Sequence, residues 1–506
     1  MDQVTEQPVK SRAHYVLAAI CLAALVLPLS FTGGAVATPA IGADFNADPV
    51  ALAWVTNAFM LSFGSLLMAA GTLSDIYGRK RLFTAGLGMF FLVSVLLANV
   101  TSILWLDILR AVQGIAAAAA LSSGSAALAQ EFDGHSRTKA FSILGTTFGL
   151  GLAFGPMVSG MLVEAFGWRS IFVCTAILAG VSLLGALYQM NESRNSEAQR
   201  LDLPGVISFS VTLVAFTTAI ILGPQQGWTS FTVACLFATA LIGVAAFCCI
   251  ELKVKHPMLQ LSLLKYPRFL GVQMLPLGTC YCYIVLIVLL PFRLLGIEAV
   301  TPLQSGFMML ALSAPMLVVP LIAAWLTKWI SAGALSAIGF LIAAAGLCLL
   351  ASAGVGEHQM LAIGMLVIGV GTGLPWGLMD GLAISVVPKE RAGMAAGIFN
   401  TTRVAGEGVA LAITVACLTS FVGANLVGQP AASRLAQKLV MGDLNNIPNS
   451  SIEALRRAYE SGFNSLLFLL VAFTLLSAAS SYLLLGGNRN AAEANESGSS
   501  ADSVRG

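Results

Sequence analysis

Charged residues are scarce in this chain of 506 residues: Asp, Glu, Lys and Arg make up only 10% of it, against 57% hydrophobic residues. A soluble domain averages about 25% charged residues, so this chain has too little charge to cover a water-exposed surface. The formal net charge of +2 is too small to indicate a nucleic-acid partner. These deficits exclude an ordinary soluble protein and indicate a chain that faces lipid or its own helices.

The chain also lacks the patterns of a metal site, a disulfide framework or an enzyme. Its four histidines show no metal-ligand spacing, and no catalytic triad or phosphate-binding loop is present. The nine cysteines all fall inside apolar runs, where cysteine acts as a small hydrophobic residue: Cys21, Cys174, Cys235, Cys248, Cys249, Cys280, Cys282, Cys348 and Cys417. We therefore expect no metal, no cofactor and no enzyme activity.

Long apolar runs are what the chain has in abundance. About 20 apolar residues in a helix cross the ~30 Å hydrocarbon core of a bilayer, where open backbone groups would find no partner. Windows of this kind predict fourteen membrane helices: 14–36, 51–73, 82–100, 103–128, 138–163, 168–190, 203–223, 230–251, 268–292, 303–327, 331–353, 359–387, 392–424 and 463–486. The sequence therefore predicts an all-α membrane protein.

The basic residues orient these helices, because cytoplasmic loops carry an excess of Lys and Arg. With the N-terminus in the cytoplasm, fourteen basic residues fall in short inner turns, and only Arg169 and Arg293 fall in short outer turns. The first apolar run is too long for a signal peptide and has no evident cleavage site, so we expect an uncleaved span. Both termini are then cytoplasmic. The lack of long soluble insertions favours a bacterial inner membrane.

A charged turn joins the second and third apolar runs: Gly71-Thr-Leu-Ser-Asp-Ile-Tyr-Gly-Arg-Lys-Arg81. Asp75 lies at the C-terminal end of a helix, where the helix dipole disfavours a carboxylate, so a compensating partner is needed. Gly71 and Gly78 permit close approach and a positive φ. The turn is either a conformational latch that also uses Arg79 and Lys80, or only a topological marker of the cytoplasmic side.

Arg110 lies about a third of the way into the predicted fourth span. Insertion scales put an intramembrane Arg at about 2.5–3.5 kcal/mol, so this side chain needs a partner or a wet cavity. Asp107, one turn earlier, is the nearest candidate partner. The pair is either part of a proton pathway or a structural ion pair.

The predicted fifth span is weakened by glycine and proline. Gly145, Gly149, Gly151, Gly155, Pro156 and Gly160 fall within sixteen residues. Glycine costs about 1 kcal/mol and proline about 3 kcal/mol in a helix interior, relative to alanine. This composition allows close helix approach and a bend, and it is typical of a pivot or of ordinary small-residue packing.

The second half of the chain places three more charges inside the membrane. Asp380 lies in the twelfth span, and Arg403 and Glu407 lie four residues apart on one face of the thirteenth. A carboxylate that can exchange an Arg for a proton or a cationic substrate is a minimal antiport device. The alternative is a permanent Arg403–Glu407 pair that only holds the bundle together.

Several of these motifs resemble those of the major facilitator superfamily. The pattern G-x-L-x-D-x-x-G-R-K at residues 71–80 matches its loop signature, and Arg110-x-x-Gln113-Gly resembles its fourth-span signature, whose Arg is implicated in proton transfer. Residues 151–160 resemble its antiporter motif, with Ser159 at a position where Gly is usual. The resemblance implies transport by alternating access, a conformational role for the loop, and exchange rather than uptake.

Two extra spans between two six-span halves resemble the fourteen-span drug:proton antiporter family of that superfamily. The expected organisation is a cytoplasmic N-terminus at 1–13, a six-helix half at 14–190, inserted helices at 203–251, a six-helix half at 268–486 and a disordered tail at 487–506. The outer loop 422–462 should carry a short amphipathic helix that begins with a capping box at Ser450–Glu453. That helix would be a surface connector or a lid.

One residue departs from that resemblance. Fourteen-span drug exporters commonly carry an Asp in the first span, where this chain has Ser30. If that acid is the usual proton carrier, Glu407 or Asp380 must replace it here, or the substrate or coupling differs.

We therefore expect a proton-driven exporter of lipophilic or cationic organic compounds, or an exporter of one metabolite or siderophore on the same fold. The expected partners are a small-molecule substrate, protons and the lipid bilayer, and the sequence leaves a periplasmic adaptor open. The expected cavity-lining residues are Trp54, Asn57, Gln113, Phe148, Trp376 and Asn400.

Overall fold

The computed structural model describes residues 7–132, 134–194, 202–254, 257, 259, 263, 265–387, 392–426, 432–442 and 452–485. This part of the chain is helical and contains no strand. The predicted tail at 487–506 and the capping residues 450 and 451 lie outside the described residues.

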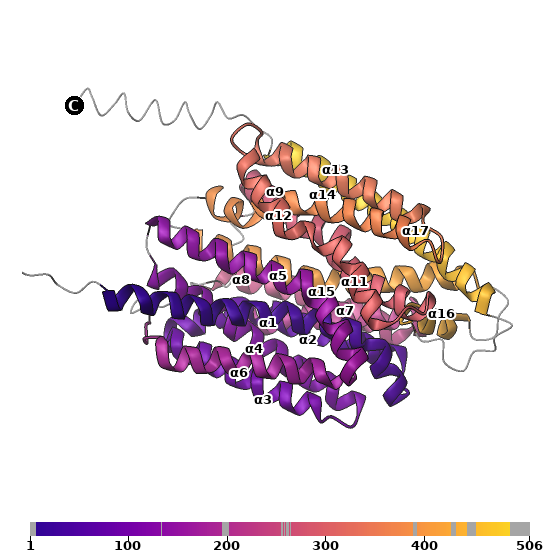
Figure 1. Ribbon diagram of the computed structural model, residues 1–506, viewed down its shortest axis with the longest axis horizontal. Coiled ribbons are helices and arrows are strands. Elements are labelled where there is room, and N and C mark those ends of the chain that lie inside the picture. Colours follow the sequence, from indigo (N-terminus) through magenta and orange to yellow (C-terminus); the bar gives the residue numbers. More distant parts are fainter. Residues whose placement is uncertain are drawn as a thin grey trace, which may run out of the picture.

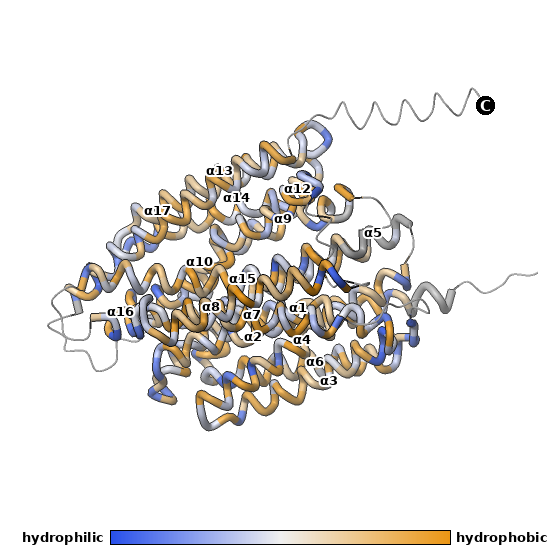
Figure 2. Tube along the Cα trace, turned by 180° about the vertical axis from the view of Figure 1, so that it is seen from behind, coloured by the Kyte–Doolittle hydropathy of each residue, from blue (hydrophilic) through white to orange (hydrophobic). Residues whose placement is uncertain are grey.

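Fourteen helices are long and apolar enough to cross a membrane, which confirms the predicted number. The first eight spans are α1 (Gln7–Phe45), α2 (Pro49–Tyr77), α3 (Arg79–Ala98), α4 (Ile103–Glu131), α5 (Gly134–Phe166), α6 (Arg169–Gln189), α7 (Leu203–Gln226) and α8 (Phe231–Lys253). Figure 2 shows apolar colours along the helices and hydrophilic colours concentrated near their ends.

The remaining six spans include two that are divided. Span 9 comprises α9 (Pro267–Thr279), η2 (Cys280–Ile284), α10 (Val285–Phe292) and η3 (Arg293–Ile297), and span 10 comprises α11 (Pro302–Ser313) and α12 (Pro315–Leu326). The last four are α13 (Ala332–Ser352), α14 (His358–Ser385), α15 (Ala392–Ala424) and α17 (Ile452–Leu485), and α16 (Ala432–Val440) lies between α15 and α17.

The helix starts follow from local side-chain chemistry. Asp48 accepts a hydrogen bond from the Val50 backbone amide, and Pro49 occupies the first helical position of α2. Thr301 and Gln304 form a reciprocal capping box at the start of α11. At the end of α2, Gly78 takes a φ of 113°, which allows the chain to turn directly into α3.

The two six-span bundles use the same helix pairings, as the predicted repeat requires. In the first bundle α2 packs on α4, α1 packs on α5, and α3 packs on both α4 and α6. In the second, α11 and α12 pack on α14, α9 packs on α15, and α13 packs on both α14 and α17. Figure 1 shows the first bundle in indigo to magenta and the second in orange to yellow. The inserted α7–α8 hairpin lies against this assembly, with α7 contacting both α2 and α15.

Along the α5–α11 seam the bundles touch at their outer ends, whereas the inner end of α5 leaves open space. A Cβ on Gly160 of α5 would lie 2.2 Å from the Pro302 carbonyl oxygen of α11. Glu164 of α5 accepts a 2.8 Å hydrogen bond from the Leu303 amide. By contrast, a Cβ on Gly145 or Gly149, nearer the inner end of α5, would meet nothing within 4 Å. This seam is therefore closed on the outer side and open on the inner side, which is an inward-facing arrangement.

The outer end of the first span is not broken, although it contains Gly33, Gly34 and Pro39: α1 runs through them without interruption. Its neighbours enclose this stretch: a Cβ on Gly33 would meet Ile171 at 2.6 Å, and one on Gly34 would meet Arg110 at 3.0 Å.

The expectation of a short, separate amphipathic helix in the outer loop is wrong for the segment 452–459. It forms the first turns of α17, which continues into the fourteenth span, because Tyr459 and Phe463 are buried and stacked at 5.7 Å. The short outer helix is α16.

A buried ion pair fixes the outer end of the second bundle. The Arg293 Nε donates to the Glu298 carboxylate at 2.8 Å, and each side chain is only 1% exposed. Arg293 also donates to the Ala353 carbonyl at 3.2 Å. The loop between spans 9 and 10 is thereby tied to the end of α13.

Replacing Arg293 with Met should destabilise the protein markedly, because it leaves the buried Glu298 carboxylate with only the His358 imidazole, at 3.0 Å, beside it. Breaking a buried pair costs about 3–5 kcal/mol, which thermal unfolding of the purified protein would show as a clear drop in Tm. The control is Arg169→Gln, which breaks a half-exposed 2.7 Å pair with Asp44 and should cost about 0–1 kcal/mol. Equal drops in Tm for the Arg293 and Arg169 variants would contradict this account.

Candidate functional site

Arg403 lies where the two bundles meet and pairs with an acid from a neighbouring helix. Its Nη1 donates to the Asp380 carboxylate of α14 at 3.2 Å. Its guanidinium carbon lies 5.6 Å from the rings of both Phe399 and Phe148. Phe148 belongs to α5 of the first bundle. Arg403 thus contacts both bundles. The Asp380 side chain, on the open inner side, is 58% exposed.

Glu407 lies one helical turn outward of Arg403 and is 7% exposed. Among the described residues it forms no ion pair within 4 Å, so the expected alternative of a permanent Arg403–Glu407 pair is not what the structure shows. The reason is geometric: the Arg403 guanidinium extends across to α14 and is occupied by Asp380.

A second buried cation, Arg110, sits in a hydrogen-bond network inside the first bundle. Its Nε donates to the Val55 carbonyl at 2.8 Å, and its Nη1 donates to Ser30 at 3.0 Å and to the side-chain oxygen of Gln113. Its guanidinium carbon also lies 4.5 Å from the Phe59 ring. No water-facing surface remains on this side chain.

Asp107 is not the ion-pair partner of Arg110 that the sequence favoured. The two form no ion pair within 4 Å in the described structure, and the Asp107 Oδ1 is buried without a hydrogen bond. Arg110 instead points toward α1 and α2, where Ser30 and the Val55 carbonyl accept from it. The absence of an acid at Ser30 therefore matters locally, because position 30 directly contacts this Arg.

The expected cavity-lining residues are not all brought together. Phe148 lies beside Arg403, and Trp54 and Asn400 are half-buried. Trp376 is buried, with its ring 6.1 Å from that of Tyr283. Gln113 is enclosed in the Arg110 network, where its amide nitrogen donates to Ser94 at 2.8 Å. Asn57 instead borders a cavity on the outer side.

The charged turn between α2 and α3 is held by its own bundle. Arg79 pairs with Asp75 at 3.0 Å and also donates to Gln130 of α4. Glu192, just after α6, accepts from the Lys80 and Arg81 backbone amides at 3.2 Å each. All these partners lie in the first bundle, as expected if a latch is released from the second bundle in the inward-facing state.

Sequence reasoning missed Glu192, although a signal existed. It is the acid immediately after the sixth span, on the same membrane face as the basic turn. A Cβ on Gly78 would lie 2.4 Å from its Oε1, so glycine is needed there for space as well as for φ. Near the start of the same turn, a Cβ on Gly71 would lie 3.0 Å from the Ser122 hydroxyl.

The glycines of residues 151–160 have two different neighbours. A Cβ on Gly151 would lie 2.5 Å from Pro28, and one on Gly155 would lie 2.0 Å from the Thr32 hydroxyl, so both pack on α1. Gly160 packs across the bundle interface on Pro302, and Pro156 lies beside it against Gly306 of α11. One end of the motif thus fixes α5 within its bundle, and the other forms the outer contact between bundles.

The fold and site define a membrane transporter: two repeated helix bundles that meet on one side of the membrane, with buried charges at their interface. The sequence profile of the Major Facilitator Superfamily matches residues 20–411. The chain belongs to this family, so it is a multi-pass membrane transporter and not an enzyme.

Curated relatives agree with this assignment. The chain is 30% identical over 393 residues to "Multidrug resistance protein Stp" of Mycobacterium tuberculosis, covering 77% of this chain and 73% of that protein. It is 31% identical over 414 residues to "Puromycin resistance protein pur8" of Streptomyces alboniger, covering 80% and 82%. It is 24% identical over 423 residues to "Tetracenomycin C resistance and export protein" of Streptomyces glaucescens, covering 82% and 77%.

A solved structure shows the same fold. A bacterial homologue of the human lysosomal transporter Spinster, in an inward-facing and unoccupied conformation, matches with a TM-score of 0.66 at 15% identity. The match covers 95% of this chain and 98% of that chain.

Placing a valine at Gly160 should weaken the outer contact between the bundles, because its Cβ would collide with the Pro302 carbonyl oxygen. This overpacking costs the inward-facing state about 1–3 kcal/mol. The conformational equilibrium would therefore shift about 5- to 150-fold away from that state. Spin labels at the exposed positions Phe166 and Phe307 should then report a longer outer distance.

The matched control is Gly145→Val on the same helix, where a Cβ meets nothing within 4 Å. It should leave the distance distribution unchanged. A Gly160→Val protein with the wild-type distribution would show that this contact does not set the conformation.

Proposed function

We propose that this transporter exports amphipathic organic compounds, lipophilic or cationic, in exchange for protons. The observation that carries the proposal is the arrangement of Asp380, Arg403 and Glu407 at the bundle interface. One Arg lies within reach of two carboxyl groups, but only Asp380 is paired with it in the inward-facing state.

The exchange follows from competition for Asp380. This carboxylate is more than half exposed in the open inner half, so a cationic substrate or a proton can reach it. Either would loosen the Arg403–Asp380 pair. Arg403 would then be free to turn toward Glu407, one helical turn outward, where a buried carboxylate has no partner within 4 Å among the described residues. Because Arg403 contacts aromatic rings of both bundles, this change would alter contacts across the interface.

For an uncharged substrate the membrane potential supplies enough energy for this exchange, because the proton carries one net charge inward. Moving one charge across the membrane is worth about 2.3 kcal/mol per 100 mV. At roughly 150 mV this gives about 3.5 kcal/mol, which sustains a concentration ratio of several hundredfold. No cofactor is needed in this scheme.

The relatives' names support export of antibiotics and drugs rather than uptake of a nutrient. Three bacterial proteins with between 24% and 31% identity carry names of drug or antibiotic resistance or export. The glycine contacts of residues 151–160 are also consistent with a helix that pivots between bundles.

A second candidate is an exporter dedicated to one metabolite or siderophore, and Gln273 favours it. This residue of α9 is buried, and neither atom of its amide finds a hydrogen-bond partner in the described structure. Such a group suits a substrate with matched donors and acceptors. Gln113 and Gln304 give no such support, since one belongs to the Arg110 network and the other to a capping box.

Accumulation of a lipophilic cationic dye in de-energised and then energised cells tests the proposal. Wild type should expel the dye on energisation, and Glu407→Gln or Asp380→Asn should abolish that expulsion, because the amide cannot exchange a proton. Glu453→Gln, an exposed acid at the outer start of α17, serves as the control and should match wild type.

Proteoliposomes then separate proton coupling from simple leakage. An imposed pH gradient should drive dye movement with counterflow of protons in wild type and in Glu453→Gln. Dye export that persists in both interface variants would refute their role as proton carriers. A well-expressed wild type that expels no dye would refute broad drug export and favour the dedicated exporter.

A further inference from the structure

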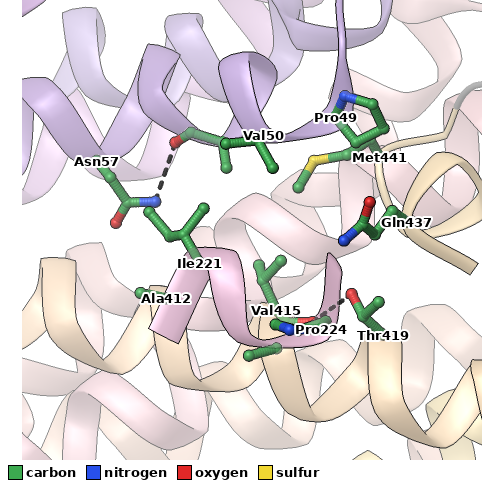
Figure 3. Close-up of a pocket in the computed structure, with 12 residues that line it drawn as sticks. Pro49, Val50, Asn57, Ile221, Pro224, Ala412, Val415, Thr419, Gln437 and Met441 are labelled. Atoms are coloured by element: carbon green, nitrogen blue, oxygen red, sulfur yellow. Dashed lines mark hydrogen bonds between the residues drawn. The ribbon is translucent and has the colours of Figure 1, made fainter. Parts of the chain in front are cut away.

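A small cavity lies on the outer side of the molecule, away from the charged interface. Four helices line it: α2, α7, α15 and α16. It is the place where the inserted hairpin, the seam between the two bundles and the outer helix α16 all meet. Figure 3 shows Asn57 and Gln437 toward opposite ends of this cavity, with Ile221 and Val415 between them.

Two amide side chains in this cavity each have an oxygen that accepts no hydrogen bond. Asn57 is 2% exposed, and its Nδ2 donates to the Ala53 carbonyl at 2.9 Å, but its Oδ1 has no hydrogen-bond partner. Gln437 is 6% exposed, and its Oε1 is likewise without a partner. A buried acceptor that is left unpaired costs about 1–3 kcal/mol. The cavity is thus built to receive hydrogen-bond donors.

The rest of the lining is apolar. Its other residues are Pro49, Val50, Ala53, Ile221, Pro224, Ala412, Val415, Ala416, Thr419 and Met441. The Thr419 hydroxyl is already used, since it donates to the Val415 carbonyl at 2.8 Å. None of the described lining residues is charged. In this state the free volume of about 20 Å³ holds little more than one water. Once the outer side opens, the lining would match an amphipathic molecule with an apolar body and hydrogen-bond donors.

The cavity lies on the seam that must open for release to the outside. The α2–α15 seam is closely packed near mid-membrane, where a Cβ on Gly64 would lie 2.5 Å from the Ala405 amide nitrogen. Because the two helices run in opposite directions, residues 49–57 of α2 face residues 412–419 of α15 on the outer side of that contact. Opening of the outer side would separate these residues and widen the cavity.

The helix α16 covers the cavity from outside. Its Ser433 hydroxyl donates to the Pro224 carbonyl of α7, and Gln437 and Met441 face the cavity. Just beyond it, a Cβ on Gly296 would lie 2.2 Å from the Cα of Gly442. The cover is thus packed on both the inserted hairpin and span 9.

We propose that this cavity is an outer substrate subsite, which an exported molecule occupies after it leaves the interface and before release. Asn57 and Gln437 select molecules that carry hydrogen-bond donors on an apolar body. The proposal rests on the export function above, and it assigns donor recognition to a place distinct from the Asp380–Arg403–Glu407 cluster.

Two probes separate donor recognition from general transport. Puromycin carries hydroxyl and amine donors on an aromatic body, whereas tetraphenylphosphonium is a lipophilic cation with no donor. Efflux of both is measured in proteoliposomes for wild type, Asn57→Leu and Gln437→Met. Each variant should raise the KM for puromycin about five- to tenfold, as the loss of one hydrogen bond predicts, and should leave tetraphenylphosphonium within about twofold.

Asn99→Leu is the matched control. Asn99 also donates to the carbonyl four residues earlier, at 2.9 Å, but it is exposed at the end of α3. It should change neither KM. Gln437→Met keeps the side-chain length and lies on a short outer helix, so it tests the subsite even where Asn57→Leu fails to fold.

The outcomes distinguish the two proposals. A wild type that exports neither probe overturns the export function, and the subsite with it. A wild type that exports both, with an unchanged puromycin KM in both variants, overturns only the subsite, as would occur if the cavity holds water alone. Equal losses for both probes also overturn it, because donor recognition would then not be the cause.

Discussion

Each arginine that this chain buries inside the membrane must find a partner, and the structure depends on how that requirement is met. Arg293 meets it with Glu298, and Arg110 meets it with hydroxyl, amide and carbonyl oxygens. Arg403 meets it with Asp380, a carboxylate that is itself largely exposed. The partners of Arg293 and of Arg110 are each enclosed within a single bundle. The Arg403–Asp380 pair lies at the interface and can be exchanged, which is why the proposed transport chemistry is placed there.

The second constraint is steric. Close contacts between helices are made where glycine leaves room for a neighbour's backbone, as at Gly64 beside Ala405 and Gly160 beside Pro302. Interiors packed to this density do not deform continuously, so they favour two discrete arrangements over a range of intermediates. The outer contacts hold one arrangement.

The inserted hairpin α7–α8 affects only one of the two seams between the bundles. It packs along α2 and contacts α15, whereas the α5–α11 seam is formed by the two bundles alone. The molecule is therefore asymmetric despite its internal repeat. The cavity beneath α16 results from this asymmetry, because its lining needs one helix of the hairpin in addition to the seam.

The number of spans and the repeat could be predicted from the sequence, because lipid imposes helix length. The charges of the loops predict which side is inner. The buried charges could be found for the same reason, since each one interrupts an apolar run. Their partners could not: Arg403 bonds to Asp380, twenty-three residues earlier on another helix, and not to Glu407 on its own face. Helical spacing gives neighbours within one helix only. The Ser30–Arg110 contact and the placement of Asn57 and Gln437 around one cavity depend on how separate helices pack. Only the tertiary structure decides this packing.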